Sequence, residues 1–169
     1  PFSLTIAYQG ANDDAALNRM VEPYGMLLGI RQYLIARDLG NGRHFRRFRL
    51  DRITSAKITG QSFARDADFD LDAYAAQSFG SYHSDVEYQP VIWRFASGAA
   101  TAAREFEFHP NQVVTDEPDG ALRVAFTASG WVEMAWHLYQ WGDKVEVIAP
   151  AELRELVKGH QRGDVGVLP

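Results

Sequence analysis

The sequence predicts an α+β protein built from two different parts, and three observations lead to this prediction. Short alternating apolar stretches and tight turns dominate residues 1–60, which is typical of a small β-barrel of the SH3 or Sm type. Residues 61–88 are acidic and polar and interrupt that pattern. From residue 89 the strand and helix patterns follow the order β-α-β-β-α-β, which is the order of a ferredoxin-like domain. We therefore expect domains at residues 1–60 and 89–169, joined by a linker with a short helix at residues 61–88.

Five strand candidates make up the first part. They cover Ser3 to Gln9, Val21 to Leu28, Arg31 to Asp38, Arg43 to Arg52 and Ile53 to Thr59. The Asn41-Gly42 pair favours a type I′ hairpin turn, which would place the fourth strand against residues 32–37. In the linker, Asp70 or Asp72 is expected to cap the short helix, because an aspartate accepts hydrogen bonds from the amides of a first helical turn.

The second part has strand candidates at residues 90–96, 113–116, 121–128 and 145–148, and helix candidates at residues 98–105 and 131–140. The middle two strands would form a hairpin around Asp119-Gly120. The second helix would bury one face, formed by apolar residues at helical spacing: Trp131, Met134, Ala135 and Leu138. A last helix is expected after Pro150, with Gly159 as its terminator.

The most unusual part of the sequence is the basic strand at residues 43–52. It contains five arginines and one aspartate, a charge of +4, although the whole chain carries −5. Alternation assigns His44, Arg46, Phe48, Leu50 and Arg52 to one face of this strand, with Phe48 and Leu50 as core residues. Guanidinium groups suit carboxylates, phosphates and stacked bases, so we interpret the strand as an anion-binding surface. The alternative is a solvated strand whose arginines pair with the chain's own acidic residues.

Composition limits the remaining classes of function. The chain has no cysteine, so disulfides, thiolate metal sites and cysteine nucleophiles are excluded, and we expect a cytoplasmic protein without a membrane segment. The aspartates at positions 66, 68, 70 and 72 do not fit a calcium loop, since Leu71 and Gln77 stand where Gly and Glu are needed. The histidines lack metal-ligand spacing, and no nucleophile motif or phosphate loop is present. We expect no metal, no cofactor and no enzymatic activity.

Three stretches resemble a known family. Residues 21–27, 32–38 and 46–53 read VEPYGML, QYLIARD and RRFRLDRI. They follow, in order, the patterns V-x-P-x-G-L, W-Y-L-x-A-x-D and R-x-F-x-L-x-R-I of the WYL-domain family, whose barrel is Sm-like. Residues 91–95, 109–112, 119–120, 136–142 and 145–154 resemble the C-terminal extension domain of that family. Gln32 departs from the pattern where the family has tryptophan, and the turn at residues 29–31 is short, so we expect an altered pocket edge.

The resemblance implies a function and a set of site residues. Members of the family are mostly bacterial transcriptional regulators with an N-terminal helix-turn-helix, and their WYL barrel is thought to sense a ligand, in several cases a nucleic acid or nucleotide. The basic strand and the strand before it line the pocket, which here implies a core set with two further candidates: Tyr33, His44, Arg46 and Arg52, then Arg37 and Arg47. Arg46 and Arg52 would lie roughly 20 Å apart on one strand face. The structural alternative is that Tyr33 fills the core and His44 sits beside the turn.

Two hypotheses of different classes follow. In the first, the chain is the sensing half of a regulator that binds a nucleotide or single-stranded nucleic acid and contacts duplex DNA only through a missing N-terminal domain. The chain starts without methionine inside a strand pattern, so we expect a fragment of a longer polypeptide. In the second, it is an accessory or structural protein whose arginines bind a protein partner. A homodimer, with Trp141 at its contact, is compatible with both.

Overall fold

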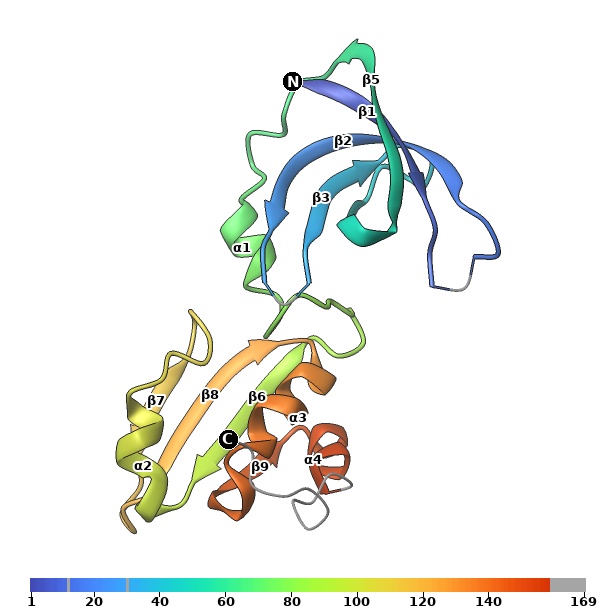
Figure 1. The fold of residues 1–169 in the computed structure, drawn as a ribbon. Helices are drawn as coiled ribbons and strands as arrows, with labels where there is room; N and C mark the ends of the chain where they lie inside the picture. Colours follow the sequence, from blue (N-terminus) through green and yellow to red (C-terminus); the bar gives the residue numbers. More distant parts are fainter. Residues whose placement is uncertain (12, 30, 159–169) are drawn as a thin grey trace. The chain divides into compact units, whose positions relative to one another are not determined.

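The computed structural model describes residues 1–11, 13–29 and 31–158, and the chain forms two compact units, Pro1–Ala75 and Ala76–Pro169. Each unit holds one sheet, in which all neighbouring strands are antiparallel, and helices accompany both sheets (Figure 1). The architecture is therefore α+β, as the sequence predicted. The expected terminator Gly159 lies outside the described residues.

The sheet of the first unit has the strand order β4-β3-β2-β1-β5. Its strands are β1 (Phe2–Tyr8), β2 (Leu17–Leu27), β3 (Tyr33–Asp38), β4 (Phe45–Arg49) and β5 (Ile53–Ser62), and the single 3₁₀ turn η1 (Leu50–Arg52) joins β4 to β5. A register shift between Pro23 and Gly25 interrupts the β2–β3 pairing. The sheet is strongly curved, and β5 crosses over β1 (Figure 1).

The concave packing surface of this sheet, which we call the inner face, holds the core of the first unit. Its buried residues are Ile6, Tyr8, Val21, Leu34, Ala36 and Phe48. The rings of Tyr8 and Phe48 meet edge to face, with their centroids 5.1 Å apart. Leu50 is half-buried against this cluster. The sequence placed Phe48 and Leu50 in the core, and the structure agrees.

The opposite surface of the sheet, which we call the outer face, is covered by residues 63–75. Phe69 stacks on Phe45 at 4.2 Å and meets Tyr24 edge to face at 4.8 Å. The segment ends in helix α1 (Leu71–Ala75), where Asp70 Oδ1 accepts hydrogen bonds from the amides of Asp72 and Ala73. Asp70 is thus the capping residue, one of the two expected. Residues 61–62 belong to β5 and residues 63–75 to the first unit, so this half of the expected linker is part of a folded body.

Residues 76–88 are held by the second unit through two carboxylates. Glu87 Oε2 accepts hydrogen bonds from the amides of Gly130 and Trp131, at 2.9 and 3.0 Å. Glu133 accepts from the amides of Ser81 and Tyr82, both at 3.2 Å. The sequence analysis assigned Glu87 to an acidic interruption of the folded pattern, but here Glu87 accepts hydrogen bonds from the backbone amides at the start of a helix.

The second unit has the sheet order β7-β8-β6-β9. Its elements are β6 (Gln89–Phe95), α2 (Ser97–Arg104), β7 (Val113–Asp116), β8 (Leu122–Ala128), α3 (Trp131–Tyr139), η2 (Gly142–Lys144), β9 (Val145–Ala149) and α4 (Ala151–Lys158). Every helix and strand expected in this region is present in the expected order, with η2 added before β9.

One face of this sheet and all three α-helices form a single core. Trp93 is fully buried at its centre, with Phe126 edge to face at 5.0 Å. The helices contribute Ala99, Ala103, Met134, Ala135, Leu138 and Leu153. The predicted apolar face of residues 131–140 is therefore correct. Trp136, in the same helix, is not part of this face and is 76% exposed. Trp141, considered for a dimer contact, is half-buried against Phe95 at 4.8 Å.

Candidate anion-binding site

The structure divides the predicted site residues between the two faces of the first sheet. Directly paired residues of antiparallel strands point to the same face, and β4 pairs Arg46 with Ala36 and Arg47 with Ile35. Arg46 therefore shares the inner face with Ala36. Tyr33, Arg37 and Arg47 alternate to the outer face. The alternation predicted for the basic strand holds over residues 45–49, the extent of β4, and it separates residues that the family resemblance groups in one site.

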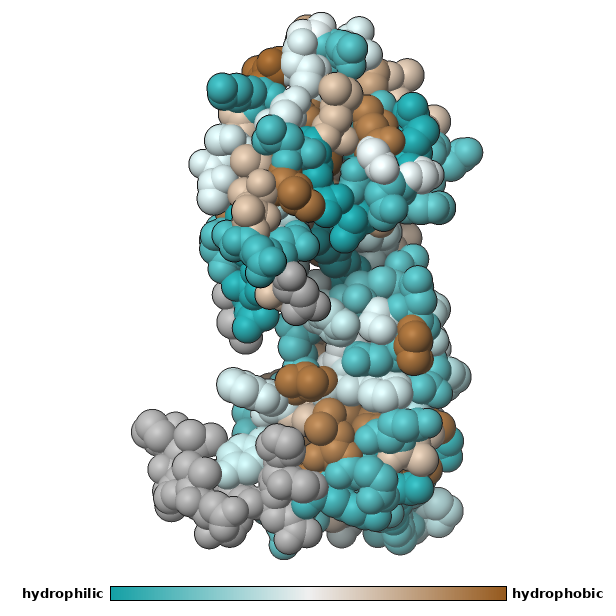
Figure 2. Space-filling model, turned by 90° about the vertical axis from the view of Figure 1, so that its right-hand side faces the viewer, coloured by the Kyte–Doolittle hydropathy of each residue, from teal (hydrophilic) through white to brown (hydrophobic). Residues whose placement is uncertain are grey.

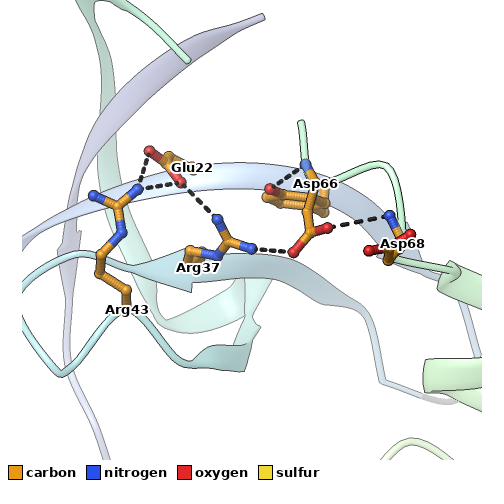
Figure 3. A network of polar contacts seen from close by, with 6 residues as sticks. Glu22, Arg37, Arg43, Asp66 and Asp68 are labelled. Carbon is orange, nitrogen blue, oxygen red and sulfur yellow. Dashed lines mark hydrogen bonds and ion pairs between the residues drawn. The ribbon is translucent and has the colours of Figure 1, made fainter. Parts of the chain in front are cut away.

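Arg37 is enclosed by the protein's own acidic residues on the outer face. Its Nη2 lies 2.7 Å from Asp66 Oδ2, and its Nη1 lies 3.7 Å from the buried carboxylate of Glu22. Arg43 contacts the same Glu22 at 3.1 Å, so one carboxylate serves two guanidinium groups (Figure 3). Only 17% of the Arg37 side chain is exposed, and its guanidinium also lies over the rings of Tyr24 and Phe45. Arg37 is therefore built into the contact between the sheet and residues 63–75.

Arg47 serves the same contact. Its Nη2 donates to the carbonyl of Tyr74 at 2.9 Å, and its guanidinium lies 5.0 Å from the centre of the Tyr74 ring. Arg47, the next residue along the strand after Arg46, therefore connects helix α1 to the outer face of the sheet. Arg37 and Arg47 thus perform a structural task that the sequence did not indicate, because Asp66 and Tyr74 lie 29 and 27 residues further along the chain, respectively.

Arg46 lies at a buried carboxylate on the inner face. Asp38 exposes only 1% of its side chain, and its Oδ2 accepts from Arg46 Nη1 at 3.2 Å and from Arg19 Nη1 at 3.1 Å. The amide of Gly40 donates to Asp38 Oδ1 at 3.1 Å. Sequence reasoning missed Arg19 and Asp38. A usable signal existed, because Asp38 is an acidic residue at the inward position of a strand with almost no polar side chains.

Arg52 does not lie on the strand that carries Arg46, so the expected spacing of about 20 Å along one strand face is wrong. Strand β4 ends at Arg49, and residues 50–52 form η1, closed by the bond from the Ile53 amide to the Leu50 carbonyl. A 3₁₀ turn advances only about 2 Å per residue, which shortens the path and rotates the side chains. The Arg52 side chain is half-buried and makes no hydrogen bond or ion pair among the described residues.

His44 occupies the position that the structural alternative gave it, but Tyr33 is buried on the outer face and not in the inner-face core. Tyr33 is buried, with 7% exposure, and pairs with Arg49 across β3 and β4. His44 is exposed at the hairpin turn, where its ring packs over Gly42 so closely that a Cβ there would lie 2.8 Å from Nε2. Gly42 has a φ of 66°, and both facts favour glycine in this turn.

The remaining arginine of the basic strand is also paired. Arg49 Nε donates to Asp51 Oδ1 at 3.0 Å, and this hydrogen bond lowers the pKa of the Asp51 carboxyl. Three of the five arginines of residues 43–52, Arg43, Arg46 and Arg49, therefore lie at the chain's own carboxylates, and Arg47 donates to a carbonyl. Within the basic strand, the arginines left for an external anion are Arg52 and Arg46, which shares its carboxylate with Arg19.

Two negative findings apply to the described residues. Among residues 1–158, apart from positions 12 and 30, there is no group of three or more His, Asp or Glu side chains that could hold a metal ion. None of the helices in the described ranges has the length and apolar character needed to cross a lipid bilayer. On the face drawn in Figure 2, polar residues dominate and hydrophobic residues appear in small separate patches.

Comparisons with known proteins match both units. Residues 3–58 match the WYL domain and residues 88–162 match the WCX domain. Protein PafC from two strains of Mycobacterium tuberculosis is 30% identical over 162 residues, covering 92% of this chain and 48% of PafC. The chain thus spans about half the length of these curated relatives.

Two solved structures are also similar. Proteasome accessory factor B/C (PafBC) of Arthrobacter aurescens is 25% identical, with a TM-score of 0.42 over 92% of this chain and 24% of that protein. A CRISPR Cas-related protein shares the fold, with a TM-score of 0.60 and 12% identity over 94% of this chain and 45% of the other. The two domain matches fall on the two units in the order that the sequence motifs indicated, and the chain belongs to the WYL-domain family, as a WYL domain followed by a WCX domain.

Proposed function

We propose that this chain is the ligand-sensing part of a bacterial transcriptional regulator and that its ligand is a nucleotide or a short single-stranded nucleic acid. Membership of the WYL-domain family supports the regulatory role. The chain spans about half the length of PafC, and we propose that another part of the regulator contacts duplex DNA. No catalytic step is part of this proposal.

The proposal also includes a fold type for each of the two units. We propose that the first unit is an Sm-like barrel and the second a ferredoxin-like domain. The 3₁₀ turn between the last two strands supports the first assignment, and the order β7-β8-β6-β9 with the succession β-α-β-β-α-β supports the second.

The observation that carries the ligand assignment is the division of the arginines. Arg37, Arg43, Arg47 and Arg49 are engaged by the chain's own acceptors. Arg52 has no such partner among the described residues, and Arg46 shares its carboxylate with Arg19. Nucleotides and nucleic acids carry phosphates, the group that a guanidinium fork binds best alongside carboxylates.

Titration of nucleotides and fluorescent single-stranded oligonucleotides tests this assignment. Removing Arg46 or Arg52 by substitution with alanine should weaken binding by roughly 1.5 to 3 kcal/mol each, the range for hydrogen bonds to charged groups. Affinity for an oligonucleotide should also fall as salt concentration rises. Arg104→Ala is the matched control, because it removes one exposed arginine, paired with Asp116, from the second unit.

Either of two results would contradict this proposal. If the wild type binds none of the ligands, or binds them as well as the Arg46→Ala/Arg52→Ala protein does, Arg52 and Arg46 are not ligand contacts. The accessory role, in which the exposed cations meet carboxylates of a protein partner, would then be favoured.

A further inference from the structure

We propose that Arg19 and Arg46 together hold one phosphate group of the ligand, and that the buried carboxylate of Asp38 positions both guanidinium groups. This inference rests on the proposed function and adds two residues to the site. Arg19 becomes a direct contact, and Asp38 becomes a positioning residue.

The charges at this point of the inner face do not balance. Asp38 brings one negative charge, and its Oδ2 contacts the guanidinium groups of both Arg19 and Arg46, at 3.1 and 3.2 Å. The other contact of this carboxylate is the neutral amide of Gly40. Two cations around one carboxylate leave a net charge of +1, and like charges held this close repel each other. A second anion placed between the two arginines would remove that repulsion.

The three residues lie on adjacent strands. The register places Asp38 opposite Val21 of β2, two residues from Arg19, and it places Arg46 opposite Ala36, two residues from Asp38. Since side chains two residues apart on a strand share a face, all three point to the inner face. Strands hold side chains more firmly than loops, and the carboxylate orients both guanidinium groups before a ligand arrives, which reduces the entropy lost on binding.

Donors remain for a ligand on both arginines. Each guanidinium carries five N–H groups, and the hydrogen bonds to Asp38 use only Nη1 of each. The side chains of Arg19 and Arg46 are 23% and 40% exposed, so both can be reached from solvent. Two forks converging on one point suit the several oxygens of a phosphate group.

The first experiment measures the affinity of a short single-stranded oligonucleotide with a 5′-phosphate. Arg19→Gln and Arg46→Gln should each weaken binding about tenfold or more, because each removes a charge-assisted contact. Arg43→Gln is the control, since Arg43 lies by Glu22 on the outer face. If Arg46→Gln and Arg52→Gln weaken binding and Arg19→Gln does not, this inference is overturned while the proposed function stands. If the wild type binds no oligonucleotide or nucleotide, the proposed function fails.

The second experiment uses inorganic phosphate and thermal unfolding. Asp38→Asn removes the only negative charge between the two arginines, so phosphate should raise its Tm by more than it raises that of the wild type. Sodium chloride at equal ionic strength should not produce this difference. Equal phosphate shifts in both proteins would overturn the inference. If Asp38→Asn does not fold, the oligonucleotide result with Arg19→Gln decides alone. A phosphate-specific gain without oligonucleotide binding would support the anion site and reject only the nucleic-acid ligand.

Discussion

On the outer face of the WYL domain, Glu22 is the central residue of an ion-pair cluster with Arg37 and Arg43. Its carboxylate is 7% exposed and lies between Arg37 and Arg43 (Figure 3). A buried carboxylate with two cationic partners is strongly coupled to them, whereas an exposed arginine contributes little by itself. The contribution of this ion-pair cluster to stability therefore depends mainly on Glu22. It depends only slightly on Arg43, whose side chain is 62% exposed.

Glu22→Gln should lower the free energy of unfolding of the first unit by about 1 to 3 kcal/mol, because it leaves buried charge on Arg37 without one of its acceptors. Arg43→Gln, the matched control in the same cluster, should cost less than about 1 kcal/mol. Urea denaturation followed by circular dichroism measures both. Equal losses in the two variants would mean that Glu22 does not anchor the cluster.

His109 links the stability of the second unit to pH. Burial lowers its pKa, and the hydrogen bond from its ring to the Ala76 carbonyl, at 2.9 Å, opposes this only in part. The unfolded chain therefore binds a proton more readily than the folded one, so stability is complete above about pH 6.5 and is lost as pH falls below it. His137 is shifted in the same direction by burial.

Unfolding midpoints measured between pH 7.5 and 5.5 test this linkage. The wild type should lose stability over this range, and His109→Gln should lose less, because glutamine has no proton to gain. The His109→Gln/His137→Gln protein should show the flattest profile. Parallel profiles for wild type and variants would show that these histidines are not the source of the acid sensitivity.

At the scale of elements, residues 63–75 act as a cover for the outer face. Phe69 is their main apolar contact, and Phe69→Ala should lower the free energy of unfolding by on the order of 2 kcal/mol, less than for a fully buried phenylalanine. It should also open new protease cleavage sites between Phe63 and Ala75. Asp68→Ala, in the same segment, is the control, because Asp68 contacts Asp66 through its backbone amide. Cleavage that is unchanged in Phe69→Ala would refute the covering role.

The same element shows why the sequence predicted strands and helices better than their contacts. Alternating apolar residues located the strands, and apolar residues at helical spacing located α3, because burial of one face imposes the period of each element on the sequence. The cover of the outer face has no such period. Its contacts join Arg37 to Asp66 and Arg47 to Tyr74, residues far apart in the chain, and an aspartate that will form an ion pair looks the same in sequence as a solvated one.

The candidate site shows the same limit. Alternation along the basic strand placed Arg46 on the same face as the core residue Phe48, but Arg19 lies 19 residues before Asp38 and was found only through their contact. The strand pattern could not reveal η1 either, since Leu50 and Ile53 fit a continuous alternation equally well.

At the scale of the whole molecule, the two units have separate cores, and the first should fold without the second. We expect a fragment of residues 1–75 to unfold cooperatively, and a fragment of residues 1–60 to lose cooperativity because it lacks the cover of Tyr24 and Phe45. Thermal unfolding followed by circular dichroism distinguishes the two. A cooperative 1–60 fragment as stable as the longer one would show that the cover is dispensable.

The cover also sets the point at which this domain could be exchanged between relatives. The WYL match ends at residue 58, yet Arg65 donates to the carbonyl of Tyr24, and Arg37 meets Asp66. In a hybrid protein joined at residue 58, Arg37 and Phe45 of this domain would face a segment from another protein. That segment need not carry the acidic and aromatic groups that contact Arg37 and Phe45 here. Joined after Ala75, each domain would keep its own partners, so the unit that can be exchanged intact ends at residue 75 and not at residue 58.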